Sequence, residues 1–355
     1  MVCLGGAELR KLEGPVLLTG HTGFKGSWMT QYLKALGIEV VGFSLPATEQ
    51  SLYMRANLSG LIREEFGNIL ELSKFKKFVE TTKPSAILHF AAQSLVKESY
   101  KNPVETFATN VMGTVNILEV ARQYDSVKAV AIVTTDKVYE NRNLKRKFKE
   151  GDAIFGNDPY SASKAAAENA VAAWRSLRSE DETPYISVLR AGNVIGGGDF
   201  SENRLLPDVV RAKISRKEMI VRNPASTRPW QHVLDPLDGY LSSLERSIRD
   251  QTELTLNFGP RENSLAVQEV IEIAKSKWPD LKVRIDNQVA GNHEAKFLDL
   301  DSSDAQRILN WQPRFNQQEA INRTLAWWDQ VLEKPAFAKD ITNAEIHEFI
   351  AMGNS

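Results

Sequence analysis

The sequence predicts an α/β protein built on a doubly wound parallel sheet, with a smaller mixed α/β lobe. Apolar runs at residues 15–19, 85–90 and 129–134 are each followed by a helical pattern, and a glycine-rich turn follows the first run. Alternating strands and helices of this kind form a parallel sheet that helices cover on both faces. A chain of 355 residues is long enough for such a sheet and a second lobe.

The individual elements follow from the spacing of apolar residues along the chain. Short apolar runs bounded by glycine or polar residues predict buried strands, and apolar residues at a 3.6-residue period predict helices. The expected strands cover residues 15–19, 39–44, 85–90 and 129–134. The expected helices begin at Ser27 and otherwise cover residues 103–124, 158–180, 235–249, 264–277, 302–310 and 317–332.

The alternation of strands and helices breaks near Asn193, where loops rich in Gly, Pro, Arg and Asn begin. We therefore expect an N-terminal extension over residues 1–14 and a Rossmann-type dinucleotide-binding domain over residues 15–190. Residues 191–355 are expected to form mainly the substrate-binding lobe and C-terminal helices, with some segments returning to the sheet.

Composition excludes several classes of function. The net charge of -1 predicts no broad attraction to nucleic acid or to acidic membranes. No stretch of 18 apolar residues occurs, so no membrane-spanning helix is expected. Cys3 is the one cysteine, which leaves no disulfide within the chain and indicates a cytoplasmic protein. The five histidines have no carboxylates at ligand spacing, and we expect no metal.

Gly20, Gly23 and Gly26 lie between the first strand and its helix. Missing side chains let the backbone approach a pyrophosphate at the helix N-terminus, whereas a tight turn without a ligand is the alternative. The second strand ends at Ser44, where an acid would hold the ribose of NAD, so the choice between NAD and NADP stays open. Lys25 either assists a phosphate or is a solvated residue of the first helical turn.

A second group of residues has the character of a proton-transfer site. Tyr160 and Lys164 are four residues apart, which places them on one helix face, and a lysine ammonium stabilises a neighbouring phenolate. Alone, such a pair is usually solvated. Thr135, Asp136 and Lys137 follow another strand, at the edge of a parallel sheet where ligands enter.

Together these motifs resemble the extended short-chain dehydrogenase/reductase family and, within it, the CDP-glucose 4,6-dehydratases. The similarity lies in four blocks, at residues 20–28, 134–141, 190–199 and 227–233. Because the blocks are spread over most of the chain, the combination is specific.

The resemblance implies a role for each residue of the proton-transfer group. Tyr160, assisted by Lys164 and Thr135, would take the C4 hydroxyl proton of a hexose while hydride passes to the nicotinamide. Asp136 would protonate the departing C6 hydroxyl. Lys137 stands where related dTDP-glucose enzymes have a glutamate base. It either removes the C5 proton, which requires a neutral amine, or stays charged and steadies the enolate or Asp136.

The resemblance also implies two sets of binding residues. Cofactor contacts are expected from Gly20, Thr22, Gly23, Phe24, Lys25, Gly26, Ser44, Asn68, Ile69, Ala91, Ala92, Asn110, Tyr160 and Lys164. Contacts with a nucleotide-sugar substrate are expected from Asn193, Arg204, Arg228 and Asn257. Arginine suits a diphosphate because its planar fork makes paired hydrogen bonds, although each of these residues could instead brace a loop. Asn68 stands where many relatives have an acid near the adenine.

The leading hypothesis is therefore an NAD-dependent 4,6-dehydratase acting on CDP-glucose. The alternatives are a 4-epimerase or reductase of the same superfamily, a 4,6-dehydratase for a GDP-, UDP- or dTDP-sugar, and a cofactor-sensing protein without activity. Asp136 argues against the epimerase, which needs no acid at C6. By analogy with relatives, the helices near 103–124 and 158–180 would form a four-helix contact in a homodimer or a dimer of dimers.

Overall fold

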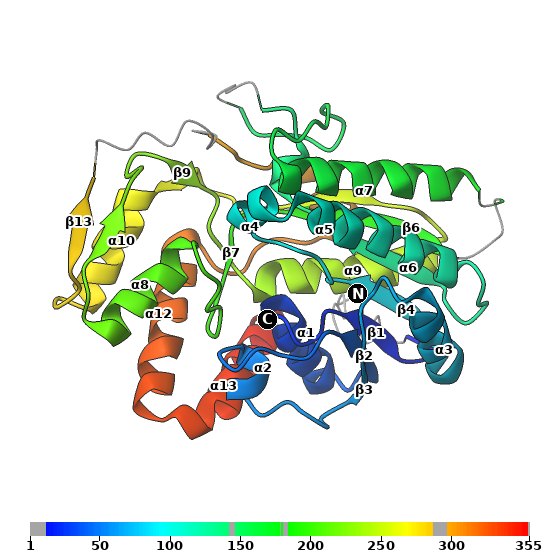
Figure 1. The fold of residues 1–355 in the computed structure, drawn as a ribbon, viewed down its shortest axis with the longest axis horizontal. Helices are drawn as coiled ribbons and strands as arrows, with labels where there is room; N and C mark the ends of the chain where they lie inside the picture. The colour runs from blue at the N-terminus through cyan, green and yellow to red at the C-terminus, as the bar shows by residue number, and fades with distance from the viewer. Residues whose placement is uncertain (1–11, 142–145, 178, 180–183, 287–296, 354–355) are drawn as a thin grey trace, which may run out of the picture.

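The computed structural model describes residues 12–141, 146–177, 179, 184–286 and 297–353. Its centre is a seven-stranded sheet with the order β11-β6-β5-β4-β1-β2-β3, in which neighbouring strands run parallel (Figure 1). The strands are β1 (Val16–Thr19), β2 (Val40–Ser44), β3 (Arg63–Phe66), β4 (Ala86–His89), β5 (Ala129–Val133), β6 (Tyr185–Ala191) and β11 (Thr255–Phe258). The chain crosses from β3 back to β4 beside β1, which is the doubly wound order expected for this fold class.

Alternate side chains of each strand enter two separate hydrophobic cores, one on each face of the sheet. Val16 and Leu18 pack in the core that contains helices α1 and α9, whereas Leu17 packs in the core that contains α3, α6 and α7. The helices are α1 (Phe24–Ala35), α9 (Leu234–Asp250), α3 (Leu72–Thr82), α6 (Gly113–Ala121) and α7 (Pro159–Ser176). Helices cover both faces, so the carboxyl edge of the sheet is where a ligand can reach the strand ends.

The helix expected over 103–124 is interrupted. It consists of α5 (Pro103–Phe107), a π-helical turn (Ala108–Met112) and α6, and the short helix α4 (Val96–Lys101) precedes it. π-helical turns inside helices occur frequently at functional sites. The spacing of apolar residues does not reveal this turn, because a π-helical turn contains the same residue types as the α-helix around it.

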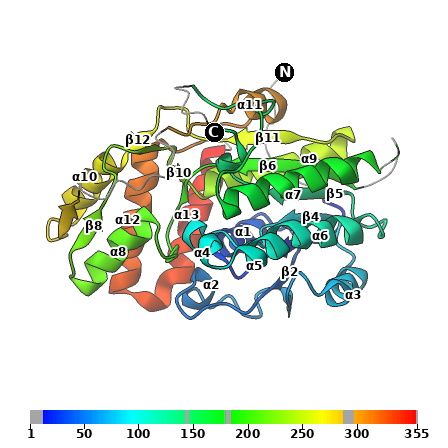
Figure 2. The same cartoon turned by 45° about the horizontal axis from the view of Figure 1, so that its top comes forward.

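Most of the smaller lobe comes from residues that follow β6 in the sequence. Figure 2 shows α8, α10 and β8 at one end of the molecule, away from α3 and α6. Its elements include α8 (Leu205–Ser215), α10 (Val267–Lys277), and the paired strands β8 (Met219–Val221) with β13 (Val283–Ile285) and β9 (Thr227–Arg228) with β12 (Leu265–Ala266). The boundaries at residues 14 and 190 stay predictions.

The C-terminal part of the chain returns to the first domain. Helix α11 (Ser303–Leu309) packs on β11, and α12 (Gln317–Glu333) packs on α10. Trp327 and Trp328 of α12 are buried in the core, as their sequence context predicts. The sequence analysis did not place α13 (Ala338–Gly353), which packs against α1. Within the described ranges, none of the helices combines the length and apolar character that a membrane crossing requires.

Candidate active site

The turn after β5 holds a buried carboxyl. Thr135 caps a short 3-10 turn by accepting the Lys137 N–H at 3.3 Å, and its hydroxyl donates to Asp136 Oδ1 at 3.0 Å. Asp136 is 2% exposed, and its other oxygen, Oδ2, lacks a hydrogen-bond partner among the described residues. Burial raises the pKa of Asp136, while the charges of Lys137 and Arg228 oppose that rise. The group is thus biased toward the protonated state that a general acid needs.

Helix α7 brings Tyr160 and Lys164 to the same strand end. It begins with Asp158 as the N-cap, which accepts the Ser161 N–H at 2.9 Å, followed by proline. The pKa of Tyr160 is raised to about 12, mainly by burial. A hydrogen bond with the Thr135 side chain has the opposite, smaller effect. Lys164 donates to the carbonyl of the last β5 residue, and burial lowers the pKa of Lys164 to about 8.

Lys25 is directed into the site rather than into solvent. Its Nζ donates to the hydroxyl of Tyr240 at 3.3 Å and lies 5.5 Å from the centre of that ring. The pKa of Lys25 is lowered to about 7, mainly by burial and in addition by the positive charges of Arg204 and Lys164. Burial also raises the pKa of Tyr240, with contributions from Tyr160 and Asp136.

Tyr240 is therefore a residue of the site that the sequence analysis missed. It lies on α9, beyond every recognised motif, and its side chain is fully buried. The apolar period of that helix predicted only that one face would be buried, and a buried tyrosine in such a face is more often core.

The glycine turn is tight enough to form a phosphate cradle. Gly20 has φ +74°, and a side-chain carbon there would come within 2.8 Å of the Ala91 backbone nitrogen. A side chain at Gly26 would overlap the carbonyl oxygen of Gly20. Gly23 is exposed at the N-cap of α1, and Phe24 is half-buried beside it. Backbone N–H groups at this helix start suit a pyrophosphate, so these residues fit a dinucleotide.

The strand ends beside the glycine turn carry hydroxyl groups. Ser44, at the end of β2, and Thr22 lie 2.7 Å apart through their side-chain oxygens. Asn68 Oδ1 accepts the Leu70 N–H at 3.0 Å, and Ile69 is buried beside it. The Asn68 oxygen retains a second lone pair for a ligand donor. These contacts fit an adenosine ribose without requiring a charged partner.

Asn110 lies in the π-helical turn and links the loop after β4 to α7. Its Oδ1 accepts the Gln93 N–H, and its Nδ2 donates to Ser163 Oγ, both at 2.8 Å. Ala91 and Ala92, just before Gln93, are half-buried. The π-helical turn thus fixes the position of the loop that faces the glycine turn.

Arg204 and Arg228 are both close enough for their charges to act on the site. Arg228 is 7% exposed and lowers the pKa of Asp136, whereas Arg204 lowers those of Lys25 and Tyr160. The Arg204 guanidinium is also 3.4 Å from a carboxylate oxygen of Asp199. Their predicted contacts with a diphosphate stay predictions. Arg228 is buried, whereas the Arg204 side chain is 36% exposed.

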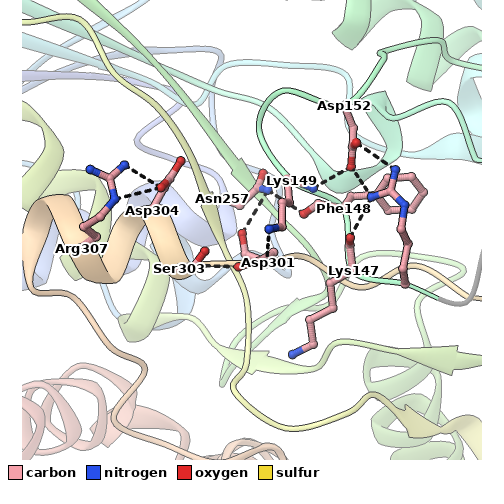
Figure 3. A network of polar contacts seen from close by, with 10 residues as sticks. Lys147, Phe148, Lys149, Asp152, Asn257, Asp301, Ser303, Asp304 and Arg307 are labelled. Carbon is pink, nitrogen blue, oxygen red and sulfur yellow. Dashed lines mark hydrogen bonds and ion pairs between the residues drawn. The ribbon is translucent and has the colours of Figure 1, made fainter.

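Asn257 makes its side-chain hydrogen bonds outside this group, and its contact with substrate stays a prediction. Its side chain is fully buried: Oδ1 accepts the Tyr139 hydroxyl at 2.7 Å, and Nδ2 donates to the carbonyls of Phe148 and Asp301 at 3.0 and 3.3 Å (Figure 3). Asn257 therefore braces β11 against two loops. Asn193, by contrast, is half-buried. Its backbone carbonyl accepts the N–H of Gln231, in strand β10 (Gln231–His232), at 3.0 Å.

Two of the histidines, His89 and His232, are buried. His89 pairs with Thr19 Oγ1 at 2.7 Å, and burial lowers the pKa of His89 to about 3, so it is neutral. His232 lies 3.2 Å from a carboxylate oxygen of Glu345 on α13. Across the described residues, no group of three His, Cys, Asp or Glu side chains could hold a metal ion.

Comparison with known proteins places this site in a family. A family model described as GDP-mannose 4,6 dehydratase matches residues 17–324. The chain belongs to the GDP-mannose 4,6-dehydratase family. The CDP-glucose 4,6-dehydratase of Salmonella typhimurium is 39% identical over 321 residues, which are 88% of this chain and 89% of that protein. This relative confirms the resemblance that the four sequence blocks indicated.

Solved structures with the same architecture confirm the fold class of this GDP-mannose 4,6-dehydratase family member. MoeE5 in complex with UDP-glucose and NAD has a TM-score of 0.77 and 24% identity, covering 90% of this chain and 100% of that one. The dTDP-glucose 4,6-dehydratase of Bacillus anthracis in complex with NAD has a TM-score of 0.75 and 21% identity, covering 90% and 98%. At these identities the likeness establishes the fold.

Proposed function

We propose that this protein is an NAD-dependent CDP-glucose 4,6-dehydratase, which converts CDP-glucose to CDP-4-keto-6-deoxyglucose. The observation that carries the proposal is the buried Asp136 carboxyl, with one oxygen unpartnered among the described residues, beside Tyr160 and Lys164. A buried carboxyl such as Asp136 can act as a general acid. Oxidation or epimerisation at C4 alone does not require such an acid. The 39% identity with the Salmonella typhimurium enzyme supports CDP-glucose as the substrate.

The cofactor would lie along the glycine turn. The backbone at Gly20, Gly23 and Gly26 would hold the pyrophosphate, and the hydroxyls of Thr22 and Ser44 would meet the adenosine ribose. NAD, when bound, supplies the group that accepts a hydride from C4 and later returns it to C6. Neutral hydroxyls at the strand end would not repel a 2′-phosphate, so NADP is a second cofactor to test.

The first step would be proton removal from the C4 hydroxyl. Tyr160 is the base, and its hydrogen bond with Thr135 favours the phenolate that this step needs. Lys164 contributes positive charge from the same helix face, held by the β5 carbonyl at 2.8 Å. Loss of the hydroxyl proton and of hydride from C4 leaves a 4-ketone.

The second step would be loss of water across C5 and C6. The 4-ketone acidifies the C5–H, and Lys137 takes that proton while Asp136 protonates the C6 hydroxyl as the C6–O bond breaks. The proton on Asp136 leaves with the water. Lys137 is half-buried and close enough to Asp136 to act on it electrostatically, which supports this role; as a base it would act in its neutral form.

The substrate diphosphate would be held by Arg204, Arg228 and Asn193. Both arginines already act electrostatically on the catalytic group, which places their charges near the sugar. A guanidinium can bind each phosphate with two hydrogen bonds. Asn193 would add a neutral donor from the loop after β6.

We also propose that the enzyme is a cytoplasmic homodimer, or a dimer of such dimers. Tyr100, Val104, Phe107 and Met112, on the segment from α4 to the π-helical turn, are 52%, 82%, 40% and 50% exposed. This segment lies alongside α7 (Figure 1), which carries alanines at positions 162, 166, 170 and 173 on one outward face. Bulky apolar residues beside a face of small ones fit a four-helix contact with a second copy.

The test of the function is incubation of the pure protein with CDP-glucose and NAD. A 4-keto-6-deoxy product has an ultraviolet band in alkali and has lost one water by mass spectrometry. We expect both signals with CDP-glucose, weaker signals with dTDP-, GDP- and UDP-glucose, and neither signal with the Asp136→Asn variant. A product of unchanged mass with inverted C4 would instead identify an epimerase, and absence of any product with all four sugars would leave the dehydratase proposal without support.

A further inference from the structure

Helix α7 is attached to the end of β5 at two successive residues. Lys164 Nζ donates to the Val133 carbonyl at 2.8 Å, and one turn further along the helix Glu168 accepts the Thr134 hydroxyl at 2.6 Å. Thr134 is followed directly by the Thr135–Asp136 turn. The spacing between the α7 pair and the β5 acid therefore depends on these two contacts.

Glu168 is held in turn by a buried arginine on the neighbouring strand β6. Glu168 and Arg190 are 6% and 4% exposed, and Arg190 Nε lies 3.0 and 3.1 Å from the two carboxylate oxygens. A buried charge of either sign is costly without its partner. The Glu168–Arg190 ion pair lies next to Lys164, and the charge of Glu168 raises the pKa of Lys164 against the effect of burial.

Arg190 extends the same contacts to the loop that leaves the catalytic turn. Its Nη1 donates to the Tyr139 hydroxyl at 2.7 Å and to the Glu150 carbonyl at 3.0 Å, and its guanidinium lies 4.8 Å from the centre of the Tyr139 ring. Tyr139 then donates to Asn257, whose contacts with the Phe148 and Asp301 carbonyls appear in Figure 3. One continuous chain of hydrogen bonds thus fixes both ends of the segment that carries Asp136.

We propose that Glu168 and Arg190 are positioning residues, which keep Lys164 cationic and hold the Thr134–Asp136 turn at a fixed distance from α7. This inference rests on the proposed dehydratase function, because the spacing matters for an enzyme that uses Tyr160 and Asp136 on one sugar. Neither residue is assigned a contact with substrate or cofactor.

The charged and titratable groups around Lys164 make the electrostatic part of the proposal specific. Lys25 faces it from α1, neutral His89 faces it from β4, and Glu168 lies on its own helix. Among the described residues, the one carboxylate that supports the ammonium is Glu168. Removing that negative charge leaves burial, which favours the neutral amine.

The variant Glu168→Gln keeps an oxygen that can accept the Thr134 hydroxyl but removes the charge. Lys164 is followed by NMR titration of ¹³Cε-labelled lysines in the protein without substrate or NAD, with Lys164→Met identifying the signal. We expect the midpoint for Lys164 to fall by about one pH unit in Glu168→Gln. An unchanged midpoint overturns the electrostatic role. The control is Glu253→Gln, which removes an ion pair with Arg175 at the other end of α7 and should leave the midpoint unchanged.

The geometric part is tested with Thr134→Val, which keeps the side-chain shape and both buried charges but loses the hydroxyl. We expect kcat for dehydration of CDP-glucose to fall about tenfold while KM changes by less than about twofold, and Thr134→Ser to restore kcat. Wild-type kcat in a folded Thr134→Val protein overturns this role. The NMR titration needs no substrate, so a failed dehydratase assay and a failed positioning role give separate results.

Discussion

Gly192 lies directly against the carboxyl of Asp136. A side-chain carbon at position 192 would come within 2.9 Å of Asp136 Oδ2 and within 2.7 Å of the Pro229 ring. Real side-chain carbons essentially never come this close to other atoms. The lack of a side chain at Gly192 therefore keeps space open beside Asp136 Oδ2, which has no hydrogen-bond partner in the described structure. The glycine belongs to the catalytic environment, although it contributes no chemical group.

We therefore expect Gly192→Ala to impair water loss more than the first oxidation. The added methyl displaces the Asp136 carboxyl but leaves α7 untouched, and we expect a fall in dehydration of about 10²-fold. Reduced nicotinamide should then accumulate after substrate is added, and its absorbance measures the effect. Gly151→Ala is the matched control, because a side chain there meets nothing within 4 Å. Equal loss of both steps in Gly192→Ala would argue against a selective effect on Asp136.

The charge of Asp136 should also be visible in stability. Burial raises its pKa above the ordinary value of 3.8, so the ionised carboxylate costs the folded state free energy. That cost grows as pH rises from 3.8 through the folded pKa and is absent at lower pH. Asp136→Asn should therefore raise Tm at pH 7 by roughly 1–3 °C, with the difference shrinking toward pH 4. Thermal unfolding at several pH values measures this, and a lower Tm than wild type at pH 7 would contradict it.

Lys137 can be separated from the oxidation site by isotope exchange. If Lys137 is the C5 base, Lys137→Ala should still form reduced cofactor with CDP-glucose but lose the exchange of the C5 hydrogen with solvent, by about 10²–10⁴-fold. The exchange is followed by NMR or mass spectrometry in deuterium oxide. Exchange at the wild-type rate would show that Lys137 is not the base and only steadies the charge that develops at the site.

The sequence predicted the sheet and the motifs at its edge because these depend on local patterns. Apolar runs gave four of the strands of the sheet, and the glycine turn and the residues 135–137 lie at strand ends as expected. β11 was harder to predict, because it lies beyond Asn193, where the regular alternation of strands and helices along the sequence breaks. Helix α13 was missed because it lies beyond every motif and packs through tertiary contacts with α1.

The residues whose roles were hardest to predict from the sequence are those whose contacts come from neighbours distant in the chain. Asn257 looked like a polar residue at a strand end, but its partners Phe148 and Asp301 come from two other loops. Tyr240 looked like core, yet Lys25 from the cofactor turn reaches its hydroxyl. In both cases the residue type allowed either role, and only the three-dimensional partner distinguishes a brace from a site residue.

The proposed dimer predicts the effect of a charge on the exposed helical face. Val104 is 82% exposed and lies on the segment beside α7, so Val104→Glu should not disturb the fold of one chain but should place a carboxylate in the four-helix contact. We expect the dissociation constant of the dimer to rise about 100-fold or more. Light scattering coupled to gel filtration measures the mass. Lys101→Glu, on the same segment, is a charge-changing control. A monomeric wild-type protein would refute the dimer.

The buried contacts of Asn257 lead to a prediction about stability rather than binding. Asn257→Ala leaves the Tyr139 hydroxyl and the Phe148 and Asp301 carbonyls without their buried partner, and each unsatisfied group costs about 1–3 kcal/mol. We expect the free energy of unfolding, measured in urea, to fall by about 2–4 kcal/mol. KM for CDP-glucose per folded molecule should stay within about twofold of wild type, because the Asn257 side chain is fully buried and already engaged by Tyr139, Phe148 and Asp301. Arg228→Ala is the contrasting variant, with a raised KM and a smaller loss of stability. A large rise in KM for Asn257→Ala without loss of stability would place Asn257 in the substrate site.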